Sequence, residues 1–302
     1  MPKADSPQIS VIIGSRNAAR TIRTCLTSLE EQSQSEMAEI IVADCSTDDT
    51  PRIIASDFPK VKLVRCPAGQ NTAQLRAAAL REARGEIVAV TEPHCVIEPG
   101  WLVAICRAFE SGEQVVVGGS VRPAGEPGLA VWAAFLSEYA AYLPPLLAGR
   151  VAMTTGNNVA YRRDDLLKCD VRAEFWKIFA SWELKAAGVS FRADPAMQVQ
   201  HIKLYNTLHF TGQRYHYGRC FAAERLKRQN LGLGQRLYHL VTLPALPALQ
   251  LWRLYRDIRP KSAYRRYFWR GLPWLLLFSF SWSLGEGLGY LAGPGHSCQE
   301  VY

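Results

Sequence analysis

Two apolar runs in this chain each end in a group of charged side chains. The run EIIVADCSTDDT covers residues 39–50, and the run GEIVAVTEPHCVIEPGWL covers residues 85–102. Apolar runs of this length are typical of buried strands, and the carboxyl ends of parallel strands meet at one edge of a sheet. We therefore expect the carboxylates and imidazoles of both runs to lie together at one edge, where a ligand would bind.

The first 100 residues alternate between strand and helix patterns. The pattern predicts strands at 8–14, 39–46, 61–66 and 86–90, and helices at 18–29, 46–54 and 72–83. This alternation indicates a mostly parallel α/β sheet. We expect Ser46 and Thr47 to cap the second helix. Later strands are expected at 114–121 and 189–201, and helices at 101–111 and 132–142.

Composition and charge favour a globular domain near an anionic surface. The chain has 302 residues, 48% of them hydrophobic, and a formal net charge of +8. Basic residues crowd the segment 214–270 beside apolar runs, without a recognised nucleic-acid motif. This arrangement favours a membrane surface over nucleic acid as the partner.

The last 70 residues contain two apolar segments. Residues 237–252 are too few to cross a bilayer, and Pro244 and Pro247 interrupt them, so we expect a re-entrant or interface-lying helix. Residues 271–293 are long enough to span but contain Glu286. Seven Arg or Lys residues lie between the segments, at 253–270. They favour a hairpin in the cytoplasmic leaflet and leave open whether the second segment spans.

The eight cysteines are scattered and form no C-x-x-C motif. We expect them to be reduced core residues of a cytosolic protein. The first eight residues contain no apolar signal region. The N-terminal domain is therefore expected to stay where it is made.

Four motifs in order carry a resemblance to a known family. SVIIGSRN (10–17), the run at 39–50, LRAAALREARGEIVAV (75–90) and PGWL (99–102) resemble successive signatures of the family 2 glycosyltransferases. The resemblance implies a GT-A fold, which is a Rossmann-like nucleotide-diphospho-sugar transferase domain, over residues 1–225. A C-terminal hydrophobic, helical, membrane-associated region would follow at 226–302.

The resemblance also implies residues for nucleotide binding. Asp44 matches the carboxylate that holds the nucleobase, Arg76 matches an arginine that reaches base or phosphate, and Glu92 lies beside the diphosphate. The first-turn residues lack the usual Pro and Tyr; they are Gly14, Ser15, Arg16 and Asn17. The turn also lacks the glycine pattern of a dinucleotide site, which argues against NAD. The alternatives are that Asp44 only caps a helix and that Arg76 is a surface residue.

A metal site is implied at the fourth strand. The family has Asp-x-Asp there, and this chain has Glu92-Pro93-His94. His201 matches a histidine that would be a third ligand or a diphosphate contact. One carboxylate with imidazole suits Mn²⁺ better than Mg²⁺. The alternative is that no metal binds and both histidines are structural.

The catalytic base and the acceptor region are implied less directly. The family's acidic pair falls at Trp176 and Lys177 here, so we nominate Glu174 first and Glu183 second, against the alternative that both are surface charge. Gly156 and Asn157 open the motif GNNVAYRR, which would line the acceptor or diphosphate region. Two arginines of the segment 213–225 would contact diphosphate, lipid phosphate or anionic headgroups; these are Arg214 and Arg219.

The resemblance implies an inverting glycosyltransferase, and the basic and apolar segments lead us to expect it at the cytoplasmic face of the inner membrane. It would move a sugar from a nucleotide-diphosphate sugar, with a UDP-sugar favoured, to a lipid-linked or cell-envelope glycan acceptor. Mn²⁺ or Mg²⁺ would be its cofactor, and nucleic acid is not expected as a partner. The second hypothesis is a GT-A scaffold that binds a nucleotide sugar or a partner without turnover.

Overall fold

The computed structural model describes residues 7–33, 35–110, 112–113, 115–202 and 206–301. The prediction about a signal region concerns residues 1–8, most of which lie outside this range. The chain divides into two compact units. The first comprises Met1–Ala124 and Tyr142–Ile202, and the second comprises Gly125–Ala141 and Lys203–Tyr302. The boundary predicted at residue 225 falls inside the long helix α8, Thr207–Gln229.

The first unit is built on one mixed sheet, which has nine strands among the described residues in the order β3-β2-β1-β4-β8-β6-β9-β5, with β7 paired to β9. The strands β3, β2, β1 and β4 are parallel neighbours, and β8 runs antiparallel to β4. The predicted alternation over the first 100 residues is therefore confirmed. The strands are β1 (Ile9–Ser15), β2 (Ala38–Asp44), β3 (Lys62–Arg65), β4 (Ile87–Thr91), β5 (Cys95–Ile97), β6 (Val115–Pro123), β7 (Gly149–Arg150), β8 (Val159–Arg162) and β9 (Ser190–His201).

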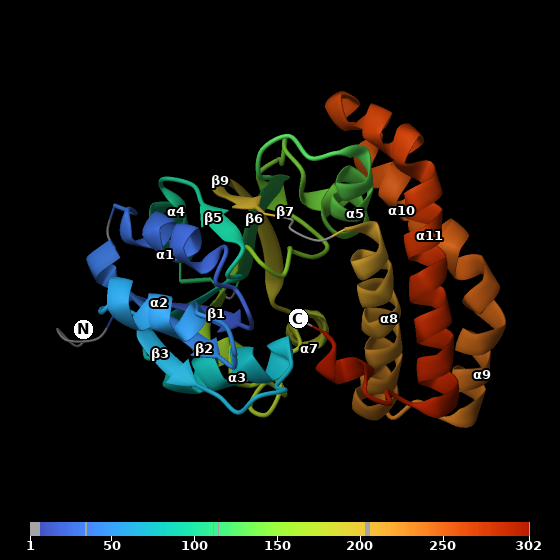
Figure 1. Cartoon of the computed structure of the whole chain (residues 1–302), viewed down its shortest axis with the longest axis horizontal. Helices are drawn as coiled ribbons and strands as arrows, with labels where there is room; N and C mark the ends of the chain where they lie inside the picture. The colour runs from blue at the N-terminus through green and yellow to red at the C-terminus, as the bar shows by residue number, and fades with distance from the viewer. Residues whose placement is uncertain (1–6, 34, 111, 114, 203–205, 302) are drawn as a thin grey trace. The chain divides into compact units, whose positions relative to one another are not determined.

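Helices cover both faces of this sheet. Figure 1 shows α1 and α4 on one face, and α3 and α7 on the other. The short 3₁₀ helix η1 (Ser35–Met37) precedes β2. The helices of this unit are α1 (Ile22–Glu30), α2 (Thr50–Asp57), α3 (Thr72–Glu82), α4 (Trp101–Phe109), α6 (Arg163–Leu166) and α7 (Lys177–Ala186).

Strand register brings the predicted site residues to one edge. In the parallel pairs, Ser15 lies opposite Asp44, and Ile13 lies opposite Thr91. The carboxyl ends of β1, β2 and β4 are therefore level, and Glu92 directly follows β4. This confirms that the two charged strand ends meet at one edge of the sheet.

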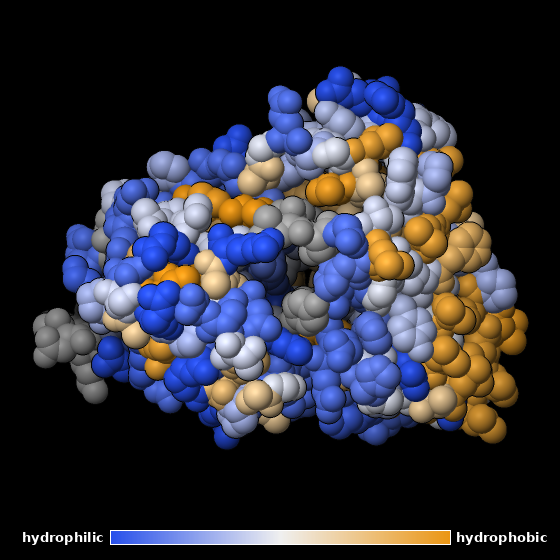
Figure 2. Space-filling model, in the orientation of Figure 1, coloured by the Kyte–Doolittle hydropathy of each residue, from blue (hydrophilic) through white to orange (hydrophobic). Residues whose placement is uncertain are grey.

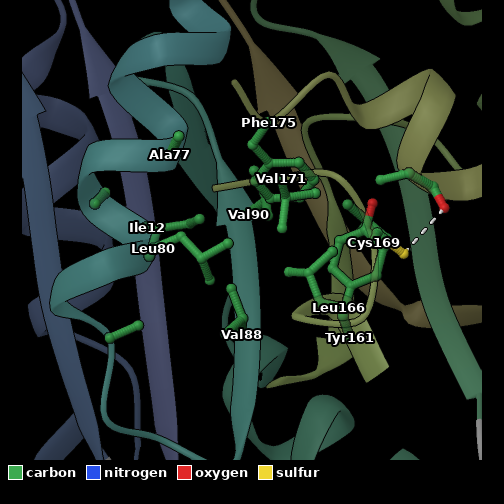
Figure 3. Packing of buried hydrophobic residues seen from close by; sticks show 14 of the residues in the cluster. Ile12, Ala77, Leu80, Val88, Val90, Tyr161, Leu166, Cys169, Val171 and Phe175 are labelled. Carbon is green, nitrogen blue, oxygen red and sulfur yellow. Dashed lines mark hydrogen bonds between the residues drawn. The ribbon is translucent and has the colours of Figure 1, made fainter. Parts of the chain in front are cut away.

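An apolar core supports the strands that end at that edge. Figure 3 shows Ile12 of β1 and Val90 of β4 packed against Leu80 of α3, with Tyr161 and Phe175 beyond them. These side chains are at most 3% exposed. Full burial of each such side chain contributes about 1.5–3 kcal/mol.

One predicted cap is wrong. The second helix begins at Thr50 with Asp49 in the N-cap position, not at Ser46 or Thr47. The Ser46 hydroxyl accepts a hydrogen bond from the backbone N–H of Asn17 instead, and the Thr47 backbone N–H donates to the Asn17 side chain. These residues join two loops across the sheet edge, which local helix signals do not reveal.

The second unit is helical. It contains α5 (Leu129–Tyr139), α8, α9 (Leu233–Thr242), α10 (Leu246–Ile258) and α11 (Ser262–Ala292), with three 3₁₀ turns, η2 (Ala140–Tyr142, whose last residue belongs to the first unit), η3 (Leu243–Ala245) and η4 (Ser297–Gln299). Trp132 of α5 stacks on Tyr267 of α11 with ring centroids 4.2 Å apart. The ammonium group of Lys261 donates to the carbonyls of Ala140 and Ala141 at the end of α5. Aromatic stacking and helix capping thus fix α5 to the start of α11.

Glycines allow α8 and α11 to approach closely. A Cβ at Gly285 would lie 2.0 Å from the carbonyl oxygen of Tyr215, and one at Gly218 would lie 2.3 Å from that of Trp282. A side chain at either position would therefore force the two helices to move apart.

The structure corrects the prediction that every cysteine is reduced. Cys220 of α8 forms a disulfide with Cys298, 78 residues further along the chain. The other six cysteines are free thiols. The pairing was missed because it joins two helical segments at long range, without any local motif.

The apolar C-terminal segments form helices, and the sequence left open whether residues 271–293 span a membrane. No helix in the described part of the chain is both long and apolar enough to cross a bilayer. The apolar stretch of α11 is diluted by serines and glycines, and its Glu286 is buried, accepting hydrogen bonds from Trp282 and Tyr290.

Apolar side chains nonetheless gather on the surface of the second unit. Figure 2 shows them over α9 and α11. On α9 these are Leu233, Leu237 and Val241, at helical spacing and 51–77% exposed. On α11, Phe280, Leu284 and Leu291 are 59–61% exposed. We call these six residues the apolar face.

We expect Gly285→Ala to lower the free energy of unfolding by about 1–3 kcal/mol, because the new methyl group would overpack the α8–α11 contact. Urea unfolding of the purified protein measures it. Gly212→Ala, in the same helix pair, is the control, since a Cβ there meets nothing within 4 Å. That change should be neutral or stabilising by up to about 1 kcal/mol. Equal stability of both variants would contradict the close helix contact.

Candidate active site

A mostly buried carboxylate at the end of β4 gathers the charged groups of the site. The Glu92 side chain is 15% exposed. Its Oε1 accepts a hydrogen bond of 3.0 Å from Nη2 of Arg76 and one of 2.8 Å from Nζ of Lys177. Arg76 comes from α3, and Lys177 is the first residue of α7. Three elements therefore converge on one carboxylate.

The protonation equilibria of this cluster follow from burial and charge. Burial alone would raise the pKa of Glu92, but Lys177, His94 and Arg76 hold that pKa well below its usual value. Burial, and then the neighbouring Arg76, lowers the pKa of Lys177 to about 8, although Glu92 acts in the opposite direction. Glu92 is therefore a carboxylate at neutral pH.

Two histidines lie on the other side of the same carboxylate. The antiparallel pairing of β5 with β9 places Cys95 opposite His201, so His94 lies beside His201 with ring centroids 4.3 Å apart. Nε2 of His94 is 3.1 Å from Oε2 of Glu92. His201 is buried, and the His94 side chain is one-third exposed.

These three side chains fit a divalent cation. Ligand atoms of Glu92, His94 and His201 all lie within 4.8 Å of one another. A carboxylate oxygen with two imidazole nitrogens is a donor set that suits Mn²⁺ better than Mg²⁺. The two oxygens of Glu92 have different partners, since Oε1 accepts from the two cations and Oε2 lies beside His94.

Asp44 ends β2 and is fully buried. Its carboxylate accepts hydrogen bonds from the backbone and the hydroxyl of Ser46, and it forms an ion pair with Arg65 at the end of β3. Asp44 does not occupy the N-cap position of α2, which is Asp49. Sequence reasoning missed Arg65, whose side chain is half exposed and covers the carboxylate.

The first turn lies beside Asp44. Asn17 has a φ of 52°, an uncommon left-handed conformation, and it bonds to Ser46 and Thr47 of the facing loop. A Cβ at Gly14 would lie 3.1 Å from that of Leu75, so this turn packs closely on α3. The Ser15 hydroxyl is buried and has no hydrogen-bond partner among the described residues.

The two candidate bases have different surroundings. Glu174 lies three residues before Lys177, and its carboxylate accepts hydrogen bonds from Asn71 and from the indole of Trp176. Glu183 accepts from the backbone N–H of Asp170 at 2.8 Å, an interaction that holds a loop. The catalytic assignment of both residues stays a prediction.

The motif at 156–163 also reaches this site. A Cβ at Gly156 would lie 2.7 Å from Cε of Lys177. The Asn157 side chain is buried, with its oxygen accepting from Thr155 and its nitrogen 3.7 Å from the sulfur of Cys95. Asn158 accepts from the indole of Trp101 at 2.7 Å, which joins the motif to the PGWL segment.

The two later arginines belong to the second unit. The Arg214 guanidinium lies over the ring of Trp282 at 4.3 Å, and Nε of Arg219 donates to the carbonyl of Gly293. Arg214 joins α8 to α11, and Arg219 joins α8 to the turn that follows α11. Their role toward a phosphate stays a prediction.

Comparisons with known proteins agree with this arrangement. The profile of the family described as Glycosyl transferase family 2 matches residues 10–169, which is more than half of the chain. Among curated proteins, the succinoglycan biosynthesis protein ExoO of Rhizobium meliloti is 28% identical over 113 residues. The match covers 37% of this chain and 32% of that protein, so the chain spans about a third of this relative.

Solved structures share the fold. The mannosyltransferase PcManGT from Pyrobaculum calidifontis, in complex with GDP-Man and Mn²⁺, is 18% identical with a TM-score of 0.59 over 94% of this chain and 88% of that one. TarS of S. aureus (residues 1–349), in complex with UDP-GlcNAc, is 17% identical with a TM-score of 0.51 over 93% of this chain and 91% of that one. At these identities the likeness shows a fold of the GT-A type.

We expect Glu92→Gln to destabilise the protein by about 3 kcal/mol, because it leaves two largely buried cations without their counter-charge. Urea unfolding at neutral pH measures this. Glu82→Gln is the control, since Glu82 forms an ion pair with Lys62 on the surface. That change should cost less than about 1 kcal/mol. Equal losses would mean that Glu92 does not stabilise the cations around it.

Proposed function

The chain is a member of glycosyl transferase family 2, and we propose that it transfers a glycosyl group from a nucleotide-diphosphate sugar to a hydroxyl acceptor. One observation carries the proposal: the carboxyl ends of β1, β2 and β4 bring Asp44 and Glu92 to one edge of the sheet, where two largely buried cations contact Glu92. Open α/β sheets bind their ligands at such an edge.

The proposed reaction is an inverting displacement. The acceptor oxygen bonds to the anomeric carbon, while the bond from that carbon to the diphosphate oxygen breaks on the opposite face. The nucleoside diphosphate leaves with the electron pair, and a carboxylate takes the acceptor proton. Glu174 is our first candidate for this base, because it lies three residues before Lys177, which contacts Glu92. Glu183 is the second candidate, although its carboxylate already holds a backbone N–H.

The donor would bind between the first turn and Asp44. A carboxylate acceptor suits the N–H of a uracil ring, which favours a UDP-sugar. Arg65 would have to move aside from Asp44 for this contact, and its half-exposed side chain can do so. The first-turn residues Ser15, Arg16 and Asn17 would line the same pocket, with the Ser15 hydroxyl offering a buried donor.

Glu92, His94 and His201 would hold Mn²⁺ or Mg²⁺, with Mn²⁺ favoured by the two imidazoles. The bound ion would supply positive charge to the departing diphosphate. The structure of PcManGT, solved with GDP-Man and Mn²⁺, supports a nucleotide sugar with a metal as the ligand class.

The acceptor is proposed to be a lipid-linked or cell-envelope glycan at the cytoplasmic face of the membrane. The apolar face of the second unit supports a membrane location, together with six exposed arginines of α10, α11 and the turn between them, Arg253, Arg256, Arg259, Arg265, Arg266 and Arg270. Disulfides are uncommon in cytosolic proteins, so the Cys220–Cys298 bond weighs against the cytoplasmic side.

A GT-A scaffold without turnover is the second candidate function. It is favoured by Lys177, which stands where the family resemblance places part of an acidic pair, and by the two cations that already neutralise Glu92. A scaffold of this kind would bind a nucleotide sugar but release no diphosphate.

We expect the detergent-purified protein to release nucleoside diphosphate from one sugar in a panel of UDP-, GDP- and TDP-sugars, supplied with membrane extract as the source of acceptor. Release should be faster with Mn²⁺ than with chelator, and His94→Ala should lower the rate at least tenfold. His209→Ala, at an exposed position of α8, is the control and should leave the rate unchanged. A nucleotide that binds through Asp44 without any release would favour the scaffold instead.

We expect the protein to sediment with anionic vesicles, and the double change Val241→Asp and Leu284→Asp to reduce the bound fraction at least tenfold. Each apolar side chain removed from the bilayer interface forfeits about 1.5–3 kcal/mol. Leu147→Asp is the control, because Leu147 is 83% exposed but lies in the first unit. Equal binding of both variants would exclude the apolar face as the membrane contact.

A further inference from the structure

The charges around Glu92 do not balance. Arg76 and Lys177 both bond to Oε1 of this carboxylate, and among the described residues neither forms an ion pair with another acidic group. Arg76 is 6% exposed, and Lys177 is 16% exposed at its side chain. A buried site with two cations and one carboxylate carries one surplus positive charge, which is costly unless an anion accompanies it.

Hydrogen-bond donors in this pair also remain unused. Nε of Arg76 is buried and has no acceptor within the described part of the chain. A lysine ammonium group has three hydrogen-bond donors, and Lys177 uses one of them to bond to Glu92. The site therefore offers several charge-assisted donors to an additional acceptor with more than one oxygen.

The backbone is shaped around the lysine. A Cβ at Gly156 would lie 2.7 Å from Cε, 3.0 Å from Nζ and 3.2 Å from Cδ of Lys177. A side chain at position 156 would displace this part of Lys177, whereas the glycine leaves room beside Glu92 for Lys177. Its ammonium group is thus pre-positioned beside Glu92 at the ligand-binding edge of the sheet.

We propose that Lys177 and Arg76 form a binding site for the diphosphate of the nucleotide, so that this chain binds nucleoside diphosphates without an added divalent cation. The proposal rests on the proposed function and adds Lys177 to its donor-binding residues. The pair bonds to Oε1 of Glu92, whereas His94, a candidate metal ligand, lies at Oε2. The two positive centres would therefore contact the diphosphate from different sides of one carboxylate.

Calorimetric titration of the full chain with UDP and GDP, in excess chelator, tests the proposal. We expect the wild type to bind one of them, and Lys177→Met to weaken that binding at least tenfold. Inorganic pyrophosphate should compete in the wild type, and the corresponding nucleoside without phosphates should bind both proteins equally. Lys185→Met is the matched control, since Lys185 is exposed on the same helix, and it should bind as the wild type does.

A second variant distinguishes a specific loss of diphosphate binding from a loss caused by misfolding. Gly156→Ala keeps the lysine but displaces its side chain, and it should also weaken diphosphate binding in chelator, while circular dichroism verifies that each variant is folded. Unchanged affinity in folded Lys177→Met, or wild-type binding that requires Mn²⁺, would overturn the proposal and leave the proposed function standing. If the wild type binds no nucleotide even with Mn²⁺, the proposed function fails with it.

Discussion

The carboxylate of Glu92 needs positively charged partners, and several elements of the first unit supply them. A carboxylate with so little access to water costs several kcal/mol unless opposite charges and donors surround it. Here one partner comes from α3, another from the first residue of α7, and a third from the loop before β5. These partners lie up to 85 residues from Glu92 in sequence. Satisfying one buried charge therefore fixes two helices and a loop against the end of β4.

The sequence prediction was most accurate where local residue patterns determine the structure. Three of the first four strands are short apolar runs, and their parallel order follows from the helices between them, so the placement of Asp44 and Glu92 at one edge was predictable. His94 lies beside His201 because β5, which follows His94, pairs with β9, which ends at His201. Their role as metal ligands stays a prediction.

Long-range pairings were harder to predict. Lys177 was recognised only as an unexpected residue in an acidic position, since nothing near it in sequence indicates Glu92 as its partner. Arg65 was missed because its contact with Asp44 depends on the register of β2 with β3. The helix caps expected at Ser46 and Thr47 were wrong because their side chains and backbone serve the facing loop. In each case a tertiary contact overrode a local signal.

The disulfide of the second unit has a topological consequence. It joins Cys220 to Cys298, so α9, α10 and α11 lie inside a covalently closed ring of the chain. A peptide bond cut anywhere in that ring would leave both pieces attached until the disulfide is reduced. Two copies of the protein also cannot exchange their last helices by a simple domain swap, because the end of each chain is tied to its own α8.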